Sequence, residues 1–157
     1  MRTHNNFWNQ TIIAHVERVE VIKGPASAVF GDASPGGTVN TVTKKPLAES
    51  RHSISARVGS YSDKYIALDS TGQIANSDDF LYRFNGGYED SETFRDNIFN
   101  KSLLLSPSLT YLLGQYTKLN FEVVYSDSKG LLDRGQPNLR GATDLSKIPM
   151  SLSSNQP

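Results

Sequence analysis

The sequence predicts a mostly β chain, in which a strand–short helix–turn–strand unit precedes about five antiparallel strands. Two observations predict this fold class. Segments after Pro46 alternate apolar and polar residues with a period of two, as half-buried strands do, and turn-forming residues separate them. Before Pro46, the β-branched runs 16–23 and 38–43 flank a cluster of glycines and prolines.

The alternating part contains about five expected strands. They cover 54–58, 65–74, 80–89, 102–113 and 118–126. In the fourth, Leu103 and Leu105 lie on the face opposite Ser102. Because turn residues follow each segment, we expect simple up-and-down antiparallel order. Pro107 lies on the apolar face of the fourth strand and cannot donate to a ladder, so a local distortion is expected there.

The polar face of these strands carries charged residues in mid-strand, at Arg57, Asp69, Arg83 and Glu122. The wet lumen of an outer-membrane barrel tolerates such charges, and so does the solvent face of a soluble sheet. Alternation alone favours the soluble sheet, because soluble sheets are far commoner. Both alternatives stay open on this evidence.

Composition excludes several classes of function. The 16 basic and 16 acidic residues balance, so charge gives no reason to expect a nucleic-acid partner. The absence of cysteine excludes disulfides and thiolate metal sites. No apolar stretch approaches the roughly 20 residues of a membrane-spanning helix. Residues 1–6 are polar, so the chain is expected to lack a signal peptide.

Residues 16–46 predict a compact unit before the alternating strands. Gly24 ends the first strand, and Pro25 suits the first position of a short helix over 26–30. Gly31 can end that helix with positive φ. A tight turn at 34–37 then leads into the second strand.

This segment, VERVEVIKGPASAVFGDASPGGTVNTVTKKP, resembles the C-terminal half of the plug of TonB-dependent outer-membrane siderophore receptors. The matching motif residues are Glu17, Arg18, Glu20, Gly24, Pro25, Gly31, Gly36, Gly37 and Asn40. Later stretches such as GSYSDKY and LSPSLTY are similar, more loosely, to the early barrel of the ferric-siderophore branch, including ferrichrome- and hydroxamate-type receptors.

The resemblance implies that 1–46 is the C-terminal part of a plug. Residues 47–157 would then be the first strands of a transmembrane β-barrel, with 129–157 as a loop or ragged end. It also implies a cell outer-membrane location, contact with outer-membrane lipid, a ferric siderophore as ligand, and TonB as partner through a box absent here. Iron would arrive only as a siderophore complex, so no cofactor is expected. About five strands cannot close a barrel, so the chain is expected to be a fragment that cannot transport alone.

Four residues are candidates for contacts with ligand or barrel. Phe30 stands where some family plugs carry a ligand-facing tyrosine, and Asp32 follows in the same loop. Packing inside the plug is the alternative for Phe30. Arg18 and Lys45 are expected to form ion pairs with acidic residues lining the barrel, with solvated charges as the alternative.

The sequence predicts neither a metal site nor an enzyme. His4, His15 and His52 lack the spacing of metal ligands. Ser27, Asp32 and His15 have no nucleophile elbow around them, so no hydrolase triad is expected. Two further functions remain as alternatives to siderophore uptake: a soluble β-rich binding module, and a surface receptor for another nutrient, a phage or a colicin on the same scaffold.

Overall fold

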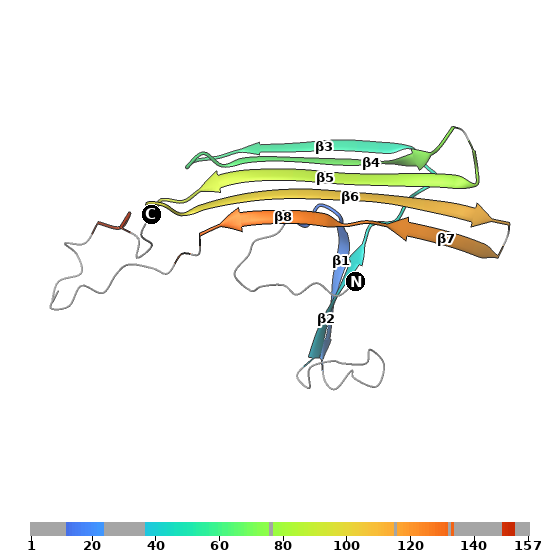
Figure 1. The fold of residues 1–157 in the computed structure, drawn as a ribbon, viewed down its shortest axis with the longest axis horizontal. Coiled ribbons are helices and arrows are strands. Elements are labelled where there is room, and N and C mark those ends of the chain that lie inside the picture. Colours follow the sequence, from blue (N-terminus) through green and yellow to red (C-terminus); the bar gives the residue numbers. More distant parts are fainter. Residues whose placement is uncertain are drawn as a thin grey trace.

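The computed structural model describes residues 12–23, 37–75, 77–114, 116–131, 133 and 149–152. These residues form two antiparallel sheets (Figure 1). A hairpin joins β1 (Val16–Lys23) to β2 (Gly37–Thr43). The mostly β, antiparallel prediction is confirmed. The short helix expected at 26–30 lies outside the described residues.

The second sheet has six strands in the order β3-β4-β5-β6-β7, with β8 also paired to β6. Every pairing is antiparallel between neighbours, as the up-and-down prediction requires. The strands are β3 (Arg51–Val58), β4 (Lys64–Gln73), β5 (Phe80–Glu92), β6 (Phe99–Leu113), β7 (Thr117–Glu122) and β8 (Tyr125–Gly130). We call this sheet the wall. No helix in the described part of the chain is long and apolar enough to cross a membrane.

The expected fifth strand of the wall is broken into β7 and β8 opposite Pro107. Glu122 pairs with Ser108 and Tyr125 with Leu105, which leaves the break beside the proline. The carbonyl of Pro107 still accepts a hydrogen bond from the Val123 N–H (3.0 Å). Proline has no N–H for the return bond, so the ladder fails there. The predicted distortion therefore falls on the partner strand, while β6 continues through Pro107.

The C-terminal end of the wall corrects one boundary. The sequence placed a loop from residue 129 onward, but β8 continues to Gly130. Lys129 pairs with Lys101 and Gly130 with Asn100, so the ladder with β6 extends past the expected end. The small Gly130 suits this position, since an added Cβ would lie 2.8 Å from the Phe99 carbonyl oxygen.

The wall buries its polar face and exposes its apolar face. The polar side chains Thr71, Asn85, Ser102, Ser106 and Thr110 are all buried, at 0 to 6% exposure. On the opposite face, Ile54 is 73% exposed and Phe121 is 64% exposed. A soluble two-layer protein shows the reverse arrangement, because it covers apolar surface first.

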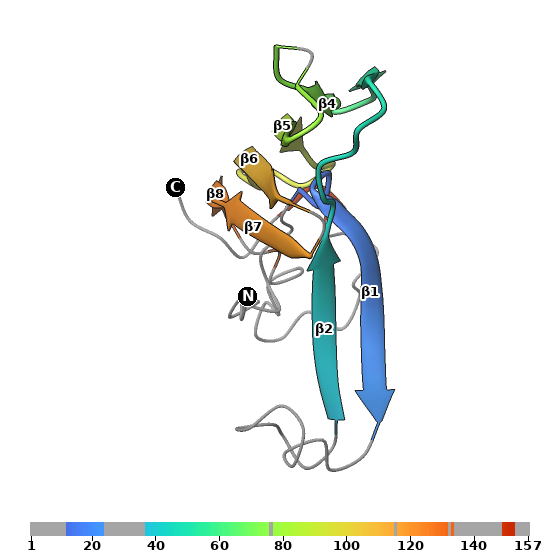
Figure 2. The same ribbon diagram turned by 90° about the vertical axis from the view of Figure 1, so that its right-hand side faces the viewer.

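The β1–β2 hairpin projects away from the wall on the side of the buried polar face (Figure 2). Among the described strands, β1 and β2 contact only each other. The hairpin meets the wall at its base, through the residues just before β1 and just after β2. That base is where the two parts of the chain are joined.

Candidate functional site

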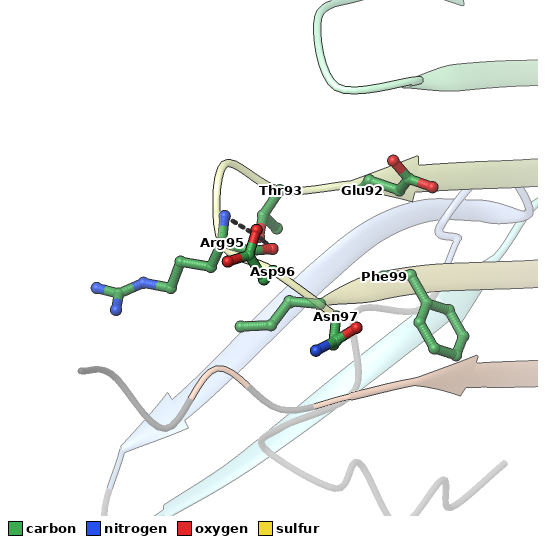
Figure 3. A pocket seen from close by; sticks show the side chains of 7 residues that line it. Glu92, Thr93, Arg95, Asp96, Asn97 and Phe99 are labelled. Atoms are coloured by element: carbon green, nitrogen blue, oxygen red, sulfur yellow. Dashed lines mark hydrogen bonds between the residues drawn. The ribbon is translucent and has the colours of Figure 1, made fainter. Parts of the chain in front are cut away.

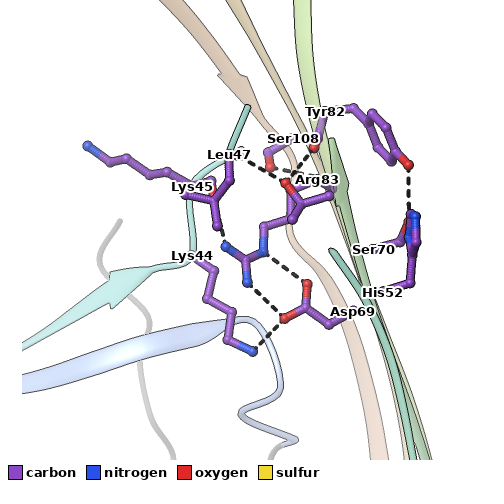
Figure 4. A network of polar contacts seen from close by, with 10 residues as sticks. Lys44, Lys45, Leu47, His52, Asp69, Ser70, Tyr82, Arg83 and Ser108 are labelled. Carbon is purple, nitrogen blue, oxygen red and sulfur yellow. Dashed lines mark hydrogen bonds and ion pairs between the residues drawn. The ribbon is translucent and has the colours of Figure 1, made fainter. Parts of the chain in front are cut away.

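The base of the hairpin is fastened to the wall by a charge network centred on Asp69 (Figure 4). Arg83 binds Asp69 with both donors of its fork, from Nε to Oδ1 and from Nη2 to Oδ2, each at 2.9 Å. Lys44 Nζ donates to the same Oδ2 at 2.9 Å. The side chains of Asp69 and Arg83 are 20% and 12% exposed, so the pair is largely shielded from water. Bidentate, shielded pairs of this kind are the strong ones.

Main-chain contacts fix the same segment. Arg83 Nη1 donates to the Lys45 carbonyl oxygen, and the Leu47 N–H donates to Thr71 Oγ1, both at 2.9 Å. The Thr71 hydroxyl in turn donates to the carbonyl of Tyr82. We call residues 44–47 the exit segment. It is held to β4 and β5 by the Lys44 side chain, the Lys45 carbonyl and the Leu47 N–H.

The exit segment also holds the residues that precede β1. The Lys44 N–H donates to the carbonyl of His15 at 2.9 Å. Burial lowers the pKa of His15 below its ordinary value, with Glu122 opposing that shift. The imidazole is therefore neutral at pH 7. A cavity of about 160 Å³ lies beside this junction, lined by residues that include Ala14, Lys44 and Asp69.

The second contact with the wall is apolar. Ile12, only 4% exposed, lies against Gly87 of β5, where an added Cβ would meet Ile12 Cγ2 at 2.8 Å. Gly87 pairs with Leu104, which is fully buried on the otherwise polar face. The missing side chain at Gly87 therefore makes the space that Ile12 occupies.

We expect Gly87→Ala to displace Ile12 and to destabilise the protein by about 1–3 kcal/mol, as overpacking does. Gly86→Ala is the matched control, because its new methyl lies on the opposite face, 3.2 Å from the ring edge of Phe84 and at ordinary contact distance, 3.9 Å, from the Leu104 carbonyl oxygen. Denaturant unfolding of both variants checks this. Equal losses of stability in the two would contradict the assigned contact.

Three of the motif residues form a network within the hairpin. Glu20 pairs with Asn40 across the two strands and accepts from Asn40 Nδ2 at 2.8 Å. Arg18 Nε donates to its other carboxylate oxygen at 2.8 Å. These two hydrogen bonds hold the pKa of Glu20 below its ordinary value, and the bond to Glu20 raises the pKa of Arg18. The motif therefore joins β1 to β2.

The lowered pKa of Glu20 predicts a pH dependence. The stabilisation is fully present above the pKa of an unfolded glutamate, about 4.3, and is lost as pH falls through the lower folded value. We expect amide-exchange protection of β1 and β2 to decrease in that window, and Glu20→Gln to remove the dependence. An NMR titration that places the Glu20 pKa at or above 4.3 would contradict the network.

A cavity of about 400 Å³ lies at the β5–β6 turn, at the end of the wall remote from the exit segment (Figure 3). Its lining is mostly polar: Glu92, Thr93, Arg95, Asp96, Asn97, Ile98 and Phe99. Arg95 forms an ion pair with Asp133, with 3.0 Å between Nε and Oδ2. The Asp96 N–H donates to the Ser151 carbonyl. Two residues from later in the chain, Asp133 and Ser151, therefore contact this turn.

The structure places only part of the predicted site. Phe30 and Asp32, the ligand candidates, lie outside the described residues, as do four of the motif residues: Gly24, Pro25, Gly31 and Gly36. Glu17 is exposed on β1, and Gly37 begins β2 opposite Lys23.

Arg18 and Lys45, which were expected to form ion pairs with acidic residues of the barrel, make other contacts in the structure. Arg18 pairs with Glu20 and Glu17 inside β1, and Lys45 reaches the wall through its carbonyl. Lys44 makes the ion pair with the wall instead. Successive residues of an extended segment point in opposite directions, so the choice between two adjacent lysines depends on register. The described residues contain no cluster of His, Asp or Glu suited to a metal ion.

Comparison with known proteins decides the family. The family described as TonB-dependent Receptor Plug Domain matches residues 1–38. The chain is also 39% identical over 132 residues to the metal-pseudopaline receptor of Pseudomonas aeruginosa, across 84% of this chain. The chain belongs to the TonB-dependent receptors. This is a family of transport receptors and not of enzymes.

The chain is also similar to other TonB-dependent receptors. The ferrioxamine receptor of Yersinia enterocolitica is 32% identical over 66% of the chain. The crystal structure of the ferric-catecholate import receptor Fiu from Escherichia coli superposes with a TM-score of 0.73 at 29% identity, over 80% of this chain. The chain spans 19% of the pseudopaline receptor, 14% of the ferrioxamine receptor and 19% of the Fiu chain.

Proposed function

We propose that this chain is the plug exit and first barrel wall of an outer-membrane receptor that takes up a metal–siderophore complex with energy from TonB. In this proposal residues 1–46 belong to the plug and 47–157 to the barrel, and the segment does not transport by itself. The observation that carries the proposal is the inverted wall, which exposes its apolar face and buries its polar face against the side where the hairpin stands.

The dimensions of the apolar face fit a membrane. On β6 the outward residues run from Leu103 to Leu113. Ten strand steps of about 3.4 Å give about 34 Å, or about 26 Å along the membrane normal at a tilt near 40°. The apolar band of outer-membrane barrels is about 25 Å tall. One strand of the wall is therefore long enough to span it.

The two ends of this apolar band carry residues typical of an interface. At one end, Lys101 Nζ pairs with Asp90 at 3.2 Å, and the Tyr88 hydroxyl donates to the same carboxylate. At the other end, Phe80 stacks on Tyr111 with ring centroids 4.4 Å apart. Aromatic girdles flank the apolar band of outer-membrane barrels at both interfaces. This pattern supports contact with outer-membrane lipid.

We assign the ligand as a metal–chelator complex, because the receptors to which the chain is similar include a metal-pseudopaline receptor and a ferrioxamine receptor. Phe30 and Asp32 remain our proposed ligand contacts, and metal would enter only inside its chelator. A complex of a metal other than iron is the second candidate, since the chain is 39% identical to the metal-pseudopaline receptor and 32% identical to the ferrioxamine receptor.

Uptake by whole cells tests this function. The full-length receptor is expressed in a strain without its own siderophore receptors, and radiolabelled ferric hydroxamate, ferric catecholate and zinc–chelator complexes are supplied. We expect saturable uptake of at least one complex, lost in a strain without TonB, and weaker binding in Phe30→Ala and Asp32→Ala. Membrane-inserted receptor that binds and imports none of them would contradict the proposal.

A further inference from the structure

The exit segment is bonded directly to the wall, whereas the hairpin that precedes it is held together by its own internal bonds. Three polar contacts, all at 2.9 Å, tie 44–47 to β4 and β5: Lys44 with Asp69, Lys45 with Arg83, and Leu47 with Thr71. By contrast, Glu20 accepts its hydrogen bonds from Arg18 and Asn40, inside the hairpin. Moving the hairpin as a unit would break none of these internal bonds.

We propose that Asp69 is an anchor that keeps the exit segment on the wall while the plug in front of it rearranges during transport. This inference rests on the proposed function. It divides the plug at the base of the hairpin into a fixed exit and a movable part. Ile12, which precedes β1, belongs to the movable part, and the backbone hydrogen bond from Lys44 N–H to the His15 carbonyl is the contact at which the two parts would separate.

Charge explains why Asp69 is the centre of the anchor. Its carboxylate accepts three hydrogen bonds from two cations, and Arg83 uses its remaining Nη1 to hold the Lys45 carbonyl. Pulling the exit segment off would separate Lys44 from Asp69 and leave the Thr71 hydroxyl, which is fully buried, without its donor. Partly shielded charges and buried hydroxyls are costly to leave unpaired.

The contact of Ile12 is of another kind. It is a van der Waals contact with Gly87, and no hydrogen bond joins the described residues 12–14 to a wall strand. Such a contact can be exchanged for another apolar contact at low cost. The Cβ atoms at positions 12 and 87 would lie 3.8 Å apart, which is the mean separation in a disulfide.

Two cross-links in the full-length receptor test whether the exit segment stays fixed while the part of the plug that contains Ile12 moves. The first joins the exit to the wall, by Leu47→Cys with Thr71→Cys, or by Lys44→Cys with Asp69→Cys bridged by a thiol reagent about as long as a lysine side chain. The second, Ile12→Cys with Gly87→Cys, forms a direct disulfide. Uptake of the metal complex is measured for each pair in the linked and the reduced state, with ligand binding as a control for folding.

We expect the exit cross-link to leave uptake within about twofold of its own reduced state. We expect the Ile12–Gly87 disulfide to reduce uptake at least tenfold, with recovery on reduction and unchanged ligand binding. Loss of uptake through the exit cross-link, restored by reduction, would overturn the anchor, and so would full uptake through the Ile12–Gly87 disulfide. Failure of the reduced receptors and the wild type alike would instead count against the proposed function.

Discussion

Leu105→Arg is expected to destabilise the membrane-inserted receptor by about 2–4 kcal/mol, the cost of a cation near the middle of the lipid face of a barrel. Leu105 is 38% exposed and lies on the row of outward residues that crosses the wall through Gly86, Leu68 and Ile54. In a soluble sheet a half-exposed leucine would tolerate arginine, within about 0.5 kcal/mol. Denaturant titration of the receptor in liposomes measures the difference.

Leu113→Arg is the matched control for this prediction. It makes the same change on the same face of β6, but at the end of the strand, beside the turn at Gly114. A position near the interface should cost only about 0–1 kcal/mol. If Leu105→Arg and Leu113→Arg prove equally mild, the apolar face does not meet lipid.

Asp69→Asn is expected to cost about 2–4 kcal/mol of stability, because it removes the negative charge shared by two partly buried cations. The amide keeps the shape of the carboxylate, so the loss reports charge and hydrogen bonding and not a cavity. Arg83, the more shielded cation, should account for more of the loss than Lys44. Denaturant unfolding of Asp69→Asn, alone and combined with Lys44→Met, measures this coupling.

Asp127→Asn is the control for Asp69→Asn. Asp127 and Lys129 of β8 lie opposite Leu103 and Lys101, at the interface end of the apolar band, with 3.9 Å between their charged groups and with both side chains well exposed. Exposed pairs of this kind contribute little. The Asp69 network would be refuted as a source of stability if Asp69→Asn were as mild as Asp127→Asn.

The period-two pattern was sufficient to predict the strands of the wall and the composition of its two faces. Leu103 and Leu105 do lie opposite Ser102 and Ser106, and the effect of Pro107 on the ladder follows from its missing N–H. Burial was not predictable in the same way. Leu104 stands on the polar face because Gly87 and Ile12 make a local apolar contact there.

The junction was harder to predict, because its partners are distant in sequence. Asp69 and Arg83 were recognised as mid-strand charges, but only the pairing of β4 with β5 brings them to the same place as Lys44. Lys45 was the lysine expected to pair with the wall, but the lysine that forms the ion pair is its neighbour Lys44. The register of an extended segment decides between such neighbours, and composition does not.

Spin labels along β6 of the full-length receptor in liposomes give the most direct test of the inverted wall. Labels at 103, 105, 109 and 111 should be accessible to oxygen dissolved in lipid and protected from a water-soluble nickel complex. Labels at 102, 104, 106 and 110 should be shielded from both, since their side chains are buried. Accessibility to the nickel complex at 103, 105 and 109 would place the apolar face in water and contradict a membrane wall.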